Sequence, residues 1–209
     1  ENTCVSVTLG GDQYGKMVEV PWAMRAMAIP EYEAYLRDEL AARLGHVLAL
    51  DVAKGSGTDR ITGIITKLLA EANTPQVKDY TALTYENLTT AMSLTSLFNG
   101  ARTLYVNEET YWLDLMGLKD TVGRPLFFQD PGISRMNSAF GVPVKFESAL
   151  ANGEILVGKP QHGYVLNWQQ DLAVVSHDKI SCLHTEVVGW AMADGHPTTT
   201  KAWALLRKN

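Results

Sequence analysis

Cysteine is scarce in this sequence of 209 residues: only Cys4 and Cys182 are present, and they lie far apart. Small secreted domains that rely on disulfides carry more cysteines, so the sequence excludes a disulfide framework, and we expect two buried thiols. Hydrophobic residues make up 46% of the chain. A chain of this length and composition can bury a core unaided, as one domain or as two small lobes that share it.

Long apolar runs are missing as well. No segment approaches the ~20 apolar residues of a membrane-spanning helix, so we expect no membrane partner. The sequence also has no signal peptide, and it begins at Glu1 rather than at Met. We therefore expect a processed product, a trimmed chain or the ordered part of a longer one.

Positive charge is not in excess either. The chain has 18 Lys and Arg against 23 Asp and Glu, a formal net charge of −5. Proteins that bind nucleic acid through charge usually carry a basic stripe, and the nearest candidate is Arg207-Lys208 close to the end of the chain. The composition therefore argues against direct, charge-driven binding of nucleic acid, although an acidic protein can still surround DNA.

Hydrophobic spacing predicts a long helix over residues 31–53. Pro30 opens it, apolar residues recur at helical spacing, and acidic residues occupy its first turns. At ~1.5 Å per residue this helix would be on the order of 35 Å long. Two shorter helices are predicted, one at 84–97 with Thr84 as its cap and one from Asn107 or Glu108 to about Gly117, with a buried strand at 104–106 between them.

Strand patterns occupy the start and the second half of the chain. Residues 4–9 and 16–20 read as strands around a glycine-rich turn at 10–15, which predicts a hairpin. Asn152-Gly153 predicts a second hairpin, and Asp194-Gly195 predicts another turn. Later strands are expected at 142–146, 154–157, 164–168, 172–175, 183–192 and 202–206. Hairpin, long helix, mixed segment and β-rich segment together make an α+β arrangement.

No group of residues assembles a recognisable active site. Gly55-Ser56-Gly57-Thr58 follows a helix and lacks the ending of a phosphate-binding loop, so we expect it to terminate that helix. The late histidines, together with Cys182 and Asp178, fit no common zinc spacing. Neighbouring Ser176 and His177 would point to opposite faces of a strand. We therefore predict no catalysis, no cofactor and no metal. The late histidines are His162, His177, His184 and His196.

Six segments follow one another between residues 5 and 206. They are the helix at 30–53, the glycine-rich loop with Thr62-Gly63-Ile64-Ile65, the strand, Asn and helix passage at 101–112, Leu-Lys-Asp-x-x-Gly-Arg at 118–124, Gly-x-Pro-Val at 141–144, and Val157-Gly158 with Tyr164-Val165. In this order and spacing they resemble the tailed-phage major capsid proteins of the Hong Kong 97 type. The first corresponds to the spine helix of that family and the last to its final sheet.

The resemblance implies an L-shaped subunit with the α+β fold of these capsid proteins. Residues 1–29 would form an extended-loop hairpin, 30–83 the spine helix and glycine-rich loop region, 84–140 an axial-type lobe, and 141–209 a peripheral-type long sheet with the closing strands. Family members usually carry more N-terminal sequence, so residues 1–20 would cover only the returning part of the extended loop, or a shortened loop.

The resemblance also implies self-assembly through hexamers and pentamers into an icosahedral head that encloses double-stranded DNA without sequence-specific binding. Portal, scaffold or decoration proteins would be further partners, and the protein would be a virion component assembled in the host cytoplasm. Two segments would contact neighbouring subunits: a hairpin tip that is mobile in the free monomer, and a turn at 176–181. Their residues are Gly10, Gly11, Asp12, Gln13, Tyr14 and Gly15, and His177, Asp178 and Lys179.

Some members of this family form Lys–Asn isopeptide links that a nearby Glu promotes. Glu186 lies where that Glu would fall and Lys16 is a possible hairpin lysine, but Asp178-Lys179-Ile180 stands where the Asn is needed, so we predict no cross-linking. Two alternatives stay open. One is an encapsulin-like compartment with the same fold, and the other is a small hydrolase or transferase that uses the late His/Cys cluster.

Overall fold

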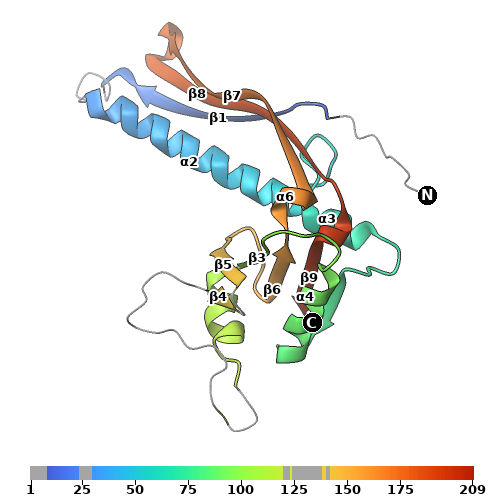
Figure 1. Ribbon diagram of the computed structural model, residues 1–209. Helices are drawn as coiled ribbons and strands as arrows, with labels where there is room; N and C mark the ends of the chain where they lie inside the picture. Colours follow the sequence, from blue (N-terminus) through green and yellow to red (C-terminus); the bar gives the residue numbers. More distant parts are fainter. Residues whose placement is uncertain (1–8, 24–29, 120–122, 124–137, 140–141) are drawn as a thin grey trace.

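The computed structural model describes residues 9–23, 30–119, 123, 138–139 and 142–209. Figure 1 shows two parts, which we call the arm and the body. The arm combines a long helix with a three-stranded sheet, and the body is built on a six-stranded sheet with shorter helices around it. Among the described residues, no helix is long and apolar enough to cross a lipid bilayer.

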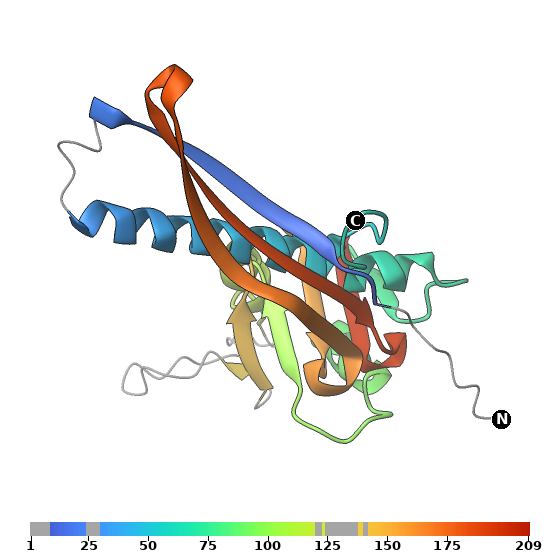
Figure 2. The same ribbon diagram turned by 90° about the horizontal axis from the view of Figure 1, so that it is seen from above.

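Helix α2 (Pro30–Lys54) forms one layer of the arm and confirms the helix predicted for residues 31–53. Leu40 and Leu44, one turn apart, are buried on the face that the arm sheet covers. A Cβ built on Gly189 of that sheet would lie 3.4 Å from the Cβ of Leu40, an ordinary van der Waals distance, so β8 packs directly against α2 at this glycine. Figure 2 shows the strands of the sheet running over the helix.

The glycine-rich loop after α2 closes through backbone contact. The N–H of Gly63 donates to the carbonyl of Gly55 at 2.9 Å. A Cβ on Gly55 would lie 2.0 Å from the carbonyl oxygen of Ile61, and a Cβ on Gly63 would lie 2.4 Å from the nitrogen of Gly55. Only glycine permits this approach, which confirms the predicted helix-terminating loop. The short helix α3 (Ile64–Ala70) follows directly.

The arm sheet has the order β1-β8-β7, with antiparallel neighbours. Its strands are β1 (Asp12–Pro21), β7 (Tyr164–Lys179) and β8 (His184–Pro197). The predicted turn at 10–15 is wrong, because residues 12–15 begin β1 and pair with residues 193–190 of β8. Leu9 lies outside any strand, and the rest of the predicted strand at 4–9 falls outside the described residues. Pairing with β8 satisfies backbone groups that a turn would leave to water.

Strand β8 continues through Asp194 and Gly195, so the turn predicted there is also wrong. A Cβ on Gly195 would lie 2.6 Å from the phenol oxygen of Tyr164, which shows that this glycine permits close packing rather than chain reversal. The strands predicted at 164–168 and 172–175 are one strand, β7, whose pairing with β8 shifts register between Trp168 and Ala173. A β-bulge absorbs the extra residues without ending the strand.

The arm hairpin turns later than expected. Its tip is the 3-10 turn η2 (Ile180–Cys182) followed by Leu183 in the left-handed region, φ 53°. The predicted turn at 176–181 therefore corresponds largely to the end of β7. Cys182 is an exposed free thiol at this tip, which contradicts the predicted burial, while Cys4 lies outside the described residues.

The body sheet has the order β2-β9-β6-β3-β5-β4. Asn152-Gly153 forms a turn, with φ +85° at Gly153, but the strands on either side of it are not paired because β3 lies between them. The hairpin predicted there is therefore wrong. The turn reverses the chain, but the largely buried strand β3 lies between β5 and β6 and pairs with both of them. The strands are β2 (Val77–Tyr80), β3 (Thr103–Val106), β4 (Ser138–Ala139), β5 (Val142–Phe146), β6 (Glu154–Gly158) and β9 (Trp203–Lys208).

The body sheet combines strands from different parts of the chain. Strands β5, β6 and β9 come from the last third of the chain, yet they share one sheet with β2 and β3 from its middle. Of the described strands in this last third, only β7 and β8 belong to the arm sheet. The chain therefore runs from arm to body, returns to the arm and ends in the body.

Helices and a buried apolar cluster complete the body. Helix α4 (Tyr85–Leu94) begins at the predicted cap, where the hydroxyl of Thr84 accepts from the N–H of Asn87 at 3.3 Å, and it ends three residues before the predicted end. Helix α5 (Glu108–Thr110) continues as the π-helical turn η1 (Tyr111–Leu115), and two short helices, α6 (Pro160–Gly163) and η3 (Thr200–Ala202), flank Trp203. The cluster that holds sheet and helices together includes Leu88, Leu104, Val106, Ile155 and Leu206.

Candidate subunit-contact surfaces

The first predicted contact segment is anchored to its own subunit. The N–H of Gly10 donates to the carboxylate of Asp194 at 2.5 Å. Tyr14 is only 8% exposed, and burial raises the pKa of its phenol. Asp12 is half-buried; its burial, and then the nearby carboxylate of Asp194, raise the pKa of its carboxyl. Residues 12–15 are therefore part of the arm sheet and not the mobile tip that we expected, although Gln13 and Gly15 are exposed.

The second predicted contact segment lies near the tip of the arm. His177, Asp178 and Lys179 end β7, and all three are exposed. Asp178 accepts a hydrogen bond from the hydroxyl of Thr185 at 2.7 Å, and the ammonium of Lys179 lies 3.0 Å from a carboxylate oxygen of Glu186. These bonds hold the end of β7 against β8 and leave its outer edge open.

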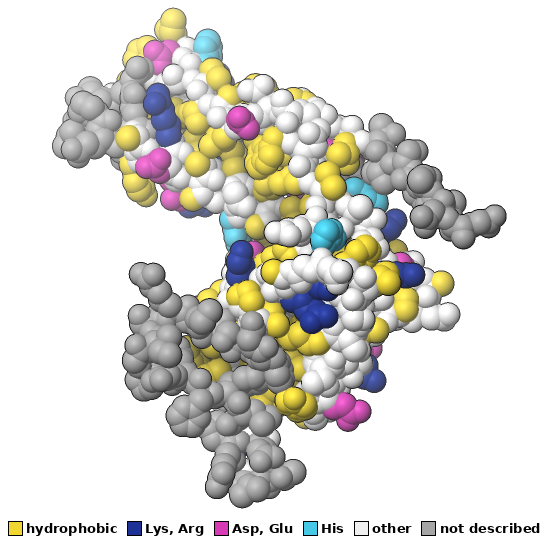
Figure 3. Space-filling view, in the orientation of Figure 1, with side chains coloured by type: hydrophobic (Ala, Val, Ile, Leu, Met, Phe, Trp, Pro, Cys, Tyr) yellow, Lys and Arg dark blue, Asp and Glu magenta, His cyan; other side chains and the backbone are white. Residues whose placement is uncertain are grey.

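The side of the arm sheet that faces away from α2, which we call the outer face, carries an apolar stripe. Buried and less buried residues alternate along β8, so its even-numbered side chains point outward. Met17 and Val175 flank Val188 in the cross-strand ladder, and they are 49% and 55% exposed. The half-buried Trp190 continues the stripe toward the body. Figure 3 shows hydrophobic side chains gathered over the arm.

The edges and tip of the arm add to this surface. Within the described residues, β1 and β7 are the two edge strands of the arm sheet, and most residues of β7 are exposed. Ile180 and Leu183 at the tip are among the most exposed large hydrophobic residues described. Long exposed edges invite pairing with another chain, and contiguous apolar patches of this kind mark interaction surfaces. The sequence analysis missed these apolar residues, although the alternating pattern along the strands is the signal that could have found them.

A smaller apolar patch lies on the body. Trp112, Leu113 and Phe146 are exposed there, and the ring of Tyr111 makes edge-to-face contacts with Trp112 and Phe146 at centroid distances of 5.2 and 5.1 Å. Such contacts hold the two exposed rings in one orientation. The body therefore also presents rigid aromatic side chains to its surroundings.

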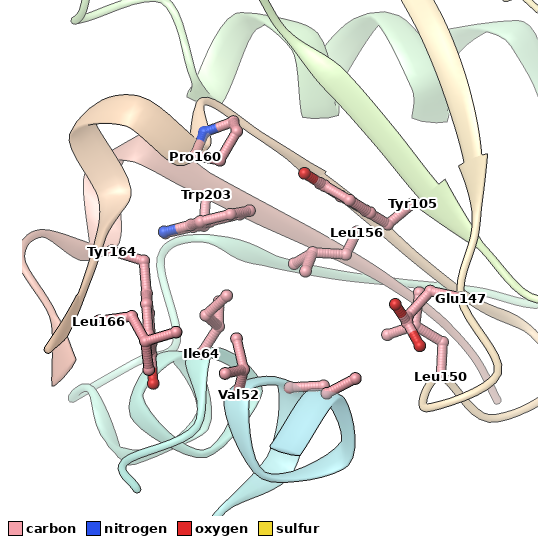
Figure 4. A pocket seen from close by; sticks show the side chains of 12 residues that line it. Val52, Ile64, Tyr105, Glu147, Leu150, Leu156, Pro160, Tyr164, Leu166 and Trp203 are labelled. Carbon is pink, nitrogen blue, oxygen red and sulfur yellow. The ribbon is translucent and has the colours of Figure 1, made fainter. Parts of the chain in front are cut away.

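A cavity of about 330 Å³ lies where the arm meets the body. Figure 4 shows Trp203, Tyr164 and Tyr105 around it, with aliphatic side chains from α2 and α3. Among the described residues that line it, only Glu147 is charged, and its carboxylate already accepts from the N–H of Ala149 at 3.2 Å. The lining does not offer the acid, base and nucleophile that catalysis combines.

The late histidines and Cys182 do not form one cluster. His162 stacks on Phe98 of the body, with ring centroids 5.8 Å apart, whereas Cys182 lies at the tip of the arm. His196 contacts the carbonyl of Pro197 at 2.8 Å, near the junction of arm and body. The arrangement therefore gives no support to a hydrolase or transferase that would use these residues together.

The comparison with protein families decides the class of the chain. The model of the phage capsid family matches residues 1–207. The chain belongs to the phage capsid family. No curated protein matches it in sequence. Proteins of this family are structural, which agrees with the prediction that the chain is not an enzyme.

Solved structures share the fold of this capsid-family protein at low sequence identity. A capsid chain from an empty GTA particle is 17% identical, with a TM-score of 0.83 over 100% of this chain and 79% of that chain. A chain from Mycobacterium phage Bobi is 14% identical, with a TM-score of 0.74 over 96% and 73%. The SrpI encapsulin of Synechococcus elongatus PCC 7942 is 15% identical, with a TM-score of 0.71 over 94% and 73%. These likenesses confirm the predicted capsid fold of the Hong Kong 97 type.

Proposed function

We propose that the protein is a major capsid protein that self-assembles through hexamers and pentamers into an icosahedral head around double-stranded DNA. The observation that carries the proposal is the outer face of the arm, where Met17 and Val175 leave apolar area in water. Apolar area of this kind contributes about 25 cal/mol per Å² when a neighbour covers it. Each contact can be modest because every subunit in a closed shell touches several others.

The contact residues are a second part of the proposal. We assign subunit contacts to residues 10–15 and to residues 177–179. Their position at the two edge strands of the arm supports this assignment, because an edge strand can add to a neighbouring sheet. Tyr14 would act indirectly, since its buried side chain supports β1 from inside the subunit.

The charge of the chain bears on its other partners. A net charge of −5 supports enclosure of DNA without a grip on its phosphates. We expect the assembled head to contact portal, scaffold or decoration proteins, to form in the host cytoplasm and to remain in the virion.

Electron microscopy of the purified protein tests the proposal. We expect closed icosahedral shells with five-fold and six-fold clusters of subunits. A protein that stays monomeric at every concentration and salt condition would overturn it. Mass spectrometry and nuclease treatment of particles isolated from producing cells would then identify their contents, and the proposal requires protected double-stranded DNA.

An encapsulin-like compartment is the second candidate, because the SrpI encapsulin shares the fold with a TM-score of 0.71. The contents of the particles separate the two functions. Co-purification of one cargo enzyme in place of DNA would favour the compartment.

A further inference from the structure

Three side chains with metal-binding atoms meet on the outer face of the arm near its tip. Glu19 lies on β1, and His184 and Glu186 lie on β8. The Nε2 atom of His184 is 3.4 Å from Oε1 of Glu186 and 3.9 Å from Oε1 of Glu19. The three ligand atoms all lie within 4.8 Å of one another.

We propose that Glu19, His184 and Glu186 bind a divalent transition-metal ion of the zinc type. Two ligands about 2.0 Å from a tetrahedral metal ion are about 3.3 Å apart. The His184–Glu186 distance of 3.4 Å is close to that value, and the side chain of Glu19, 3.9 Å from His184, would move slightly inward to complete the set. Imidazole together with carboxylates suits zinc and similar ions, whereas magnesium prefers an all-oxygen set. Three protein ligands leave the fourth position for water.

The ladder register gives an independent reason for a cation at this place. Glu19 and Glu186 are directly opposite each other in the β1–β8 pair, and like charges in that position destabilise a sheet. A cation between the two carboxylates removes the repulsion. The exposed His177 of β7 lies opposite Glu186 on its other side, so a further nitrogen ligand is within one strand spacing.

Lys179 neutralises one of the two carboxylates. Its ammonium lies 3.0 Å from Oε1 of Glu186, the same oxygen that faces His184. The Lys179 side chain is about half exposed, so it can leave without breaking the fold. A bound ion and the ammonium of Lys179 would therefore compete for the carboxylate of Glu186. Removal of the Lys179 ammonium should then strengthen metal binding, an effect that a simple ion-pair network would not produce.

The consequence of binding would be a link between β1 and β8 at the outer end of the arm. The ligands lie beside residues 177–179, so a metal ion would stiffen the part of the arm that we assign to subunit contact. The inference concerns the isolated chain and does not depend on the formation of shells.

Isothermal titration calorimetry of the full-length chain with ZnCl2, and separately with MgCl2, tests the site. We expect one zinc ion per chain, much weaker binding of magnesium, and a rise in Tm with zinc. Glu19→Gln and His184→Ala should each weaken zinc binding about tenfold or more. Lys179→Gln should bind zinc several-fold more tightly, because it removes the competitor.

Two matched controls keep the test specific. Cys182→Ser removes the nearby thiol and His46→Ala removes an exposed histidine of α2, and both should bind zinc as the unaltered chain does. The proposal is overturned if the unaltered chain binds no zinc, or if His184→Ala still binds it fully. Loss of binding in Cys182→Ser alone would assign the ion to the thiol and would also overturn the proposal. Circular dichroism of each variant confirms that the fold is intact.

Discussion

The phenol oxygen of Tyr14 accepts a hydrogen bond from the backbone N–H of Ile61, 3.4 Å away, and both residues are buried. This bond ties β1 to the loop that follows α2. Tyr14→Phe leaves a buried N–H without its acceptor, so we expect the free energy of unfolding to fall by about 1 kcal/mol. Urea unfolding measures the change, and Tyr35→Phe, whose side chain is 61% exposed, is the control. Equal stability of both variants would contradict the contact.

Two glycines should respond to alanine with opposite signs. A Cβ on Gly158 would lie 2.0 Å from a ring carbon of the buried Trp203, so Gly158→Ala should destabilise the protein by about 1–3 kcal/mol through overpacking. A Cβ on Gly45, inside α2, meets no atom within 4 Å, so Gly45→Ala should stabilise it by about 0.5–1 kcal/mol. Thermal unfolding measures both; a stabilising Gly158→Ala would refute the packing at Trp203.

Val175 on the outer face allows a test of assembly that spares the fold. Val175→Asp places a carboxylate where we propose that a neighbour covers the arm, and an unpaired buried charge is costly. A loss of ~1.4 kcal/mol per contact would already raise the concentration needed for assembly about tenfold. Light scattering and electron microscopy measure shell formation. Val175→Ile preserves the apolar surface and should assemble normally; normal shells from Val175→Asp would remove the outer face from the interface.

Covalent cross-links between subunits are not expected. Glu186 is engaged by Lys179 and His184, and Lys179 occupies the stretch in which an Asn would have to stand. Residues 178–180 therefore offer Lys16 no Asn side chain with which to form an isopeptide bond. Denaturing gel electrophoresis of assembled particles should show a single monomer band. A ladder of covalent multimers would disprove this prediction.

Sequence reasoning was most successful where a structure depends on residues close together in the chain. The spacing of apolar residues predicted α2 to within one residue at each end, and Thr84 was identified as the cap of α4. The glycine-rich loop was also predicted, because Gly55 follows directly on the last helical residue. Each of these features satisfies its own backbone hydrogen bonds locally.

Turn signals were less reliable because they do not specify a partner strand. The glycines at 10–15 predicted a hairpin, yet Tyr14 pairs with Ala191, which is far away in sequence. Asn152-Gly153 does reverse the chain, but the strands beside it pair with β3 and β9 instead of each other. A glycine in a strand can permit close packing as well as a turn, and the sequence alone does not distinguish the two.

The sequence by itself determined the long helix, its terminating loop, the mixed α and β content and the ordered segments that place the chain in the phage capsid family. The tertiary structure decided which strands pair, which apolar side chains the arm exposes, and that Glu19 meets His184 and Glu186. Several of those relationships join distant parts of the chain, since β1 pairs with β8 and β2 pairs with β9. Register across such distances is set by which faces can be buried together, and that becomes visible only when the whole chain is folded.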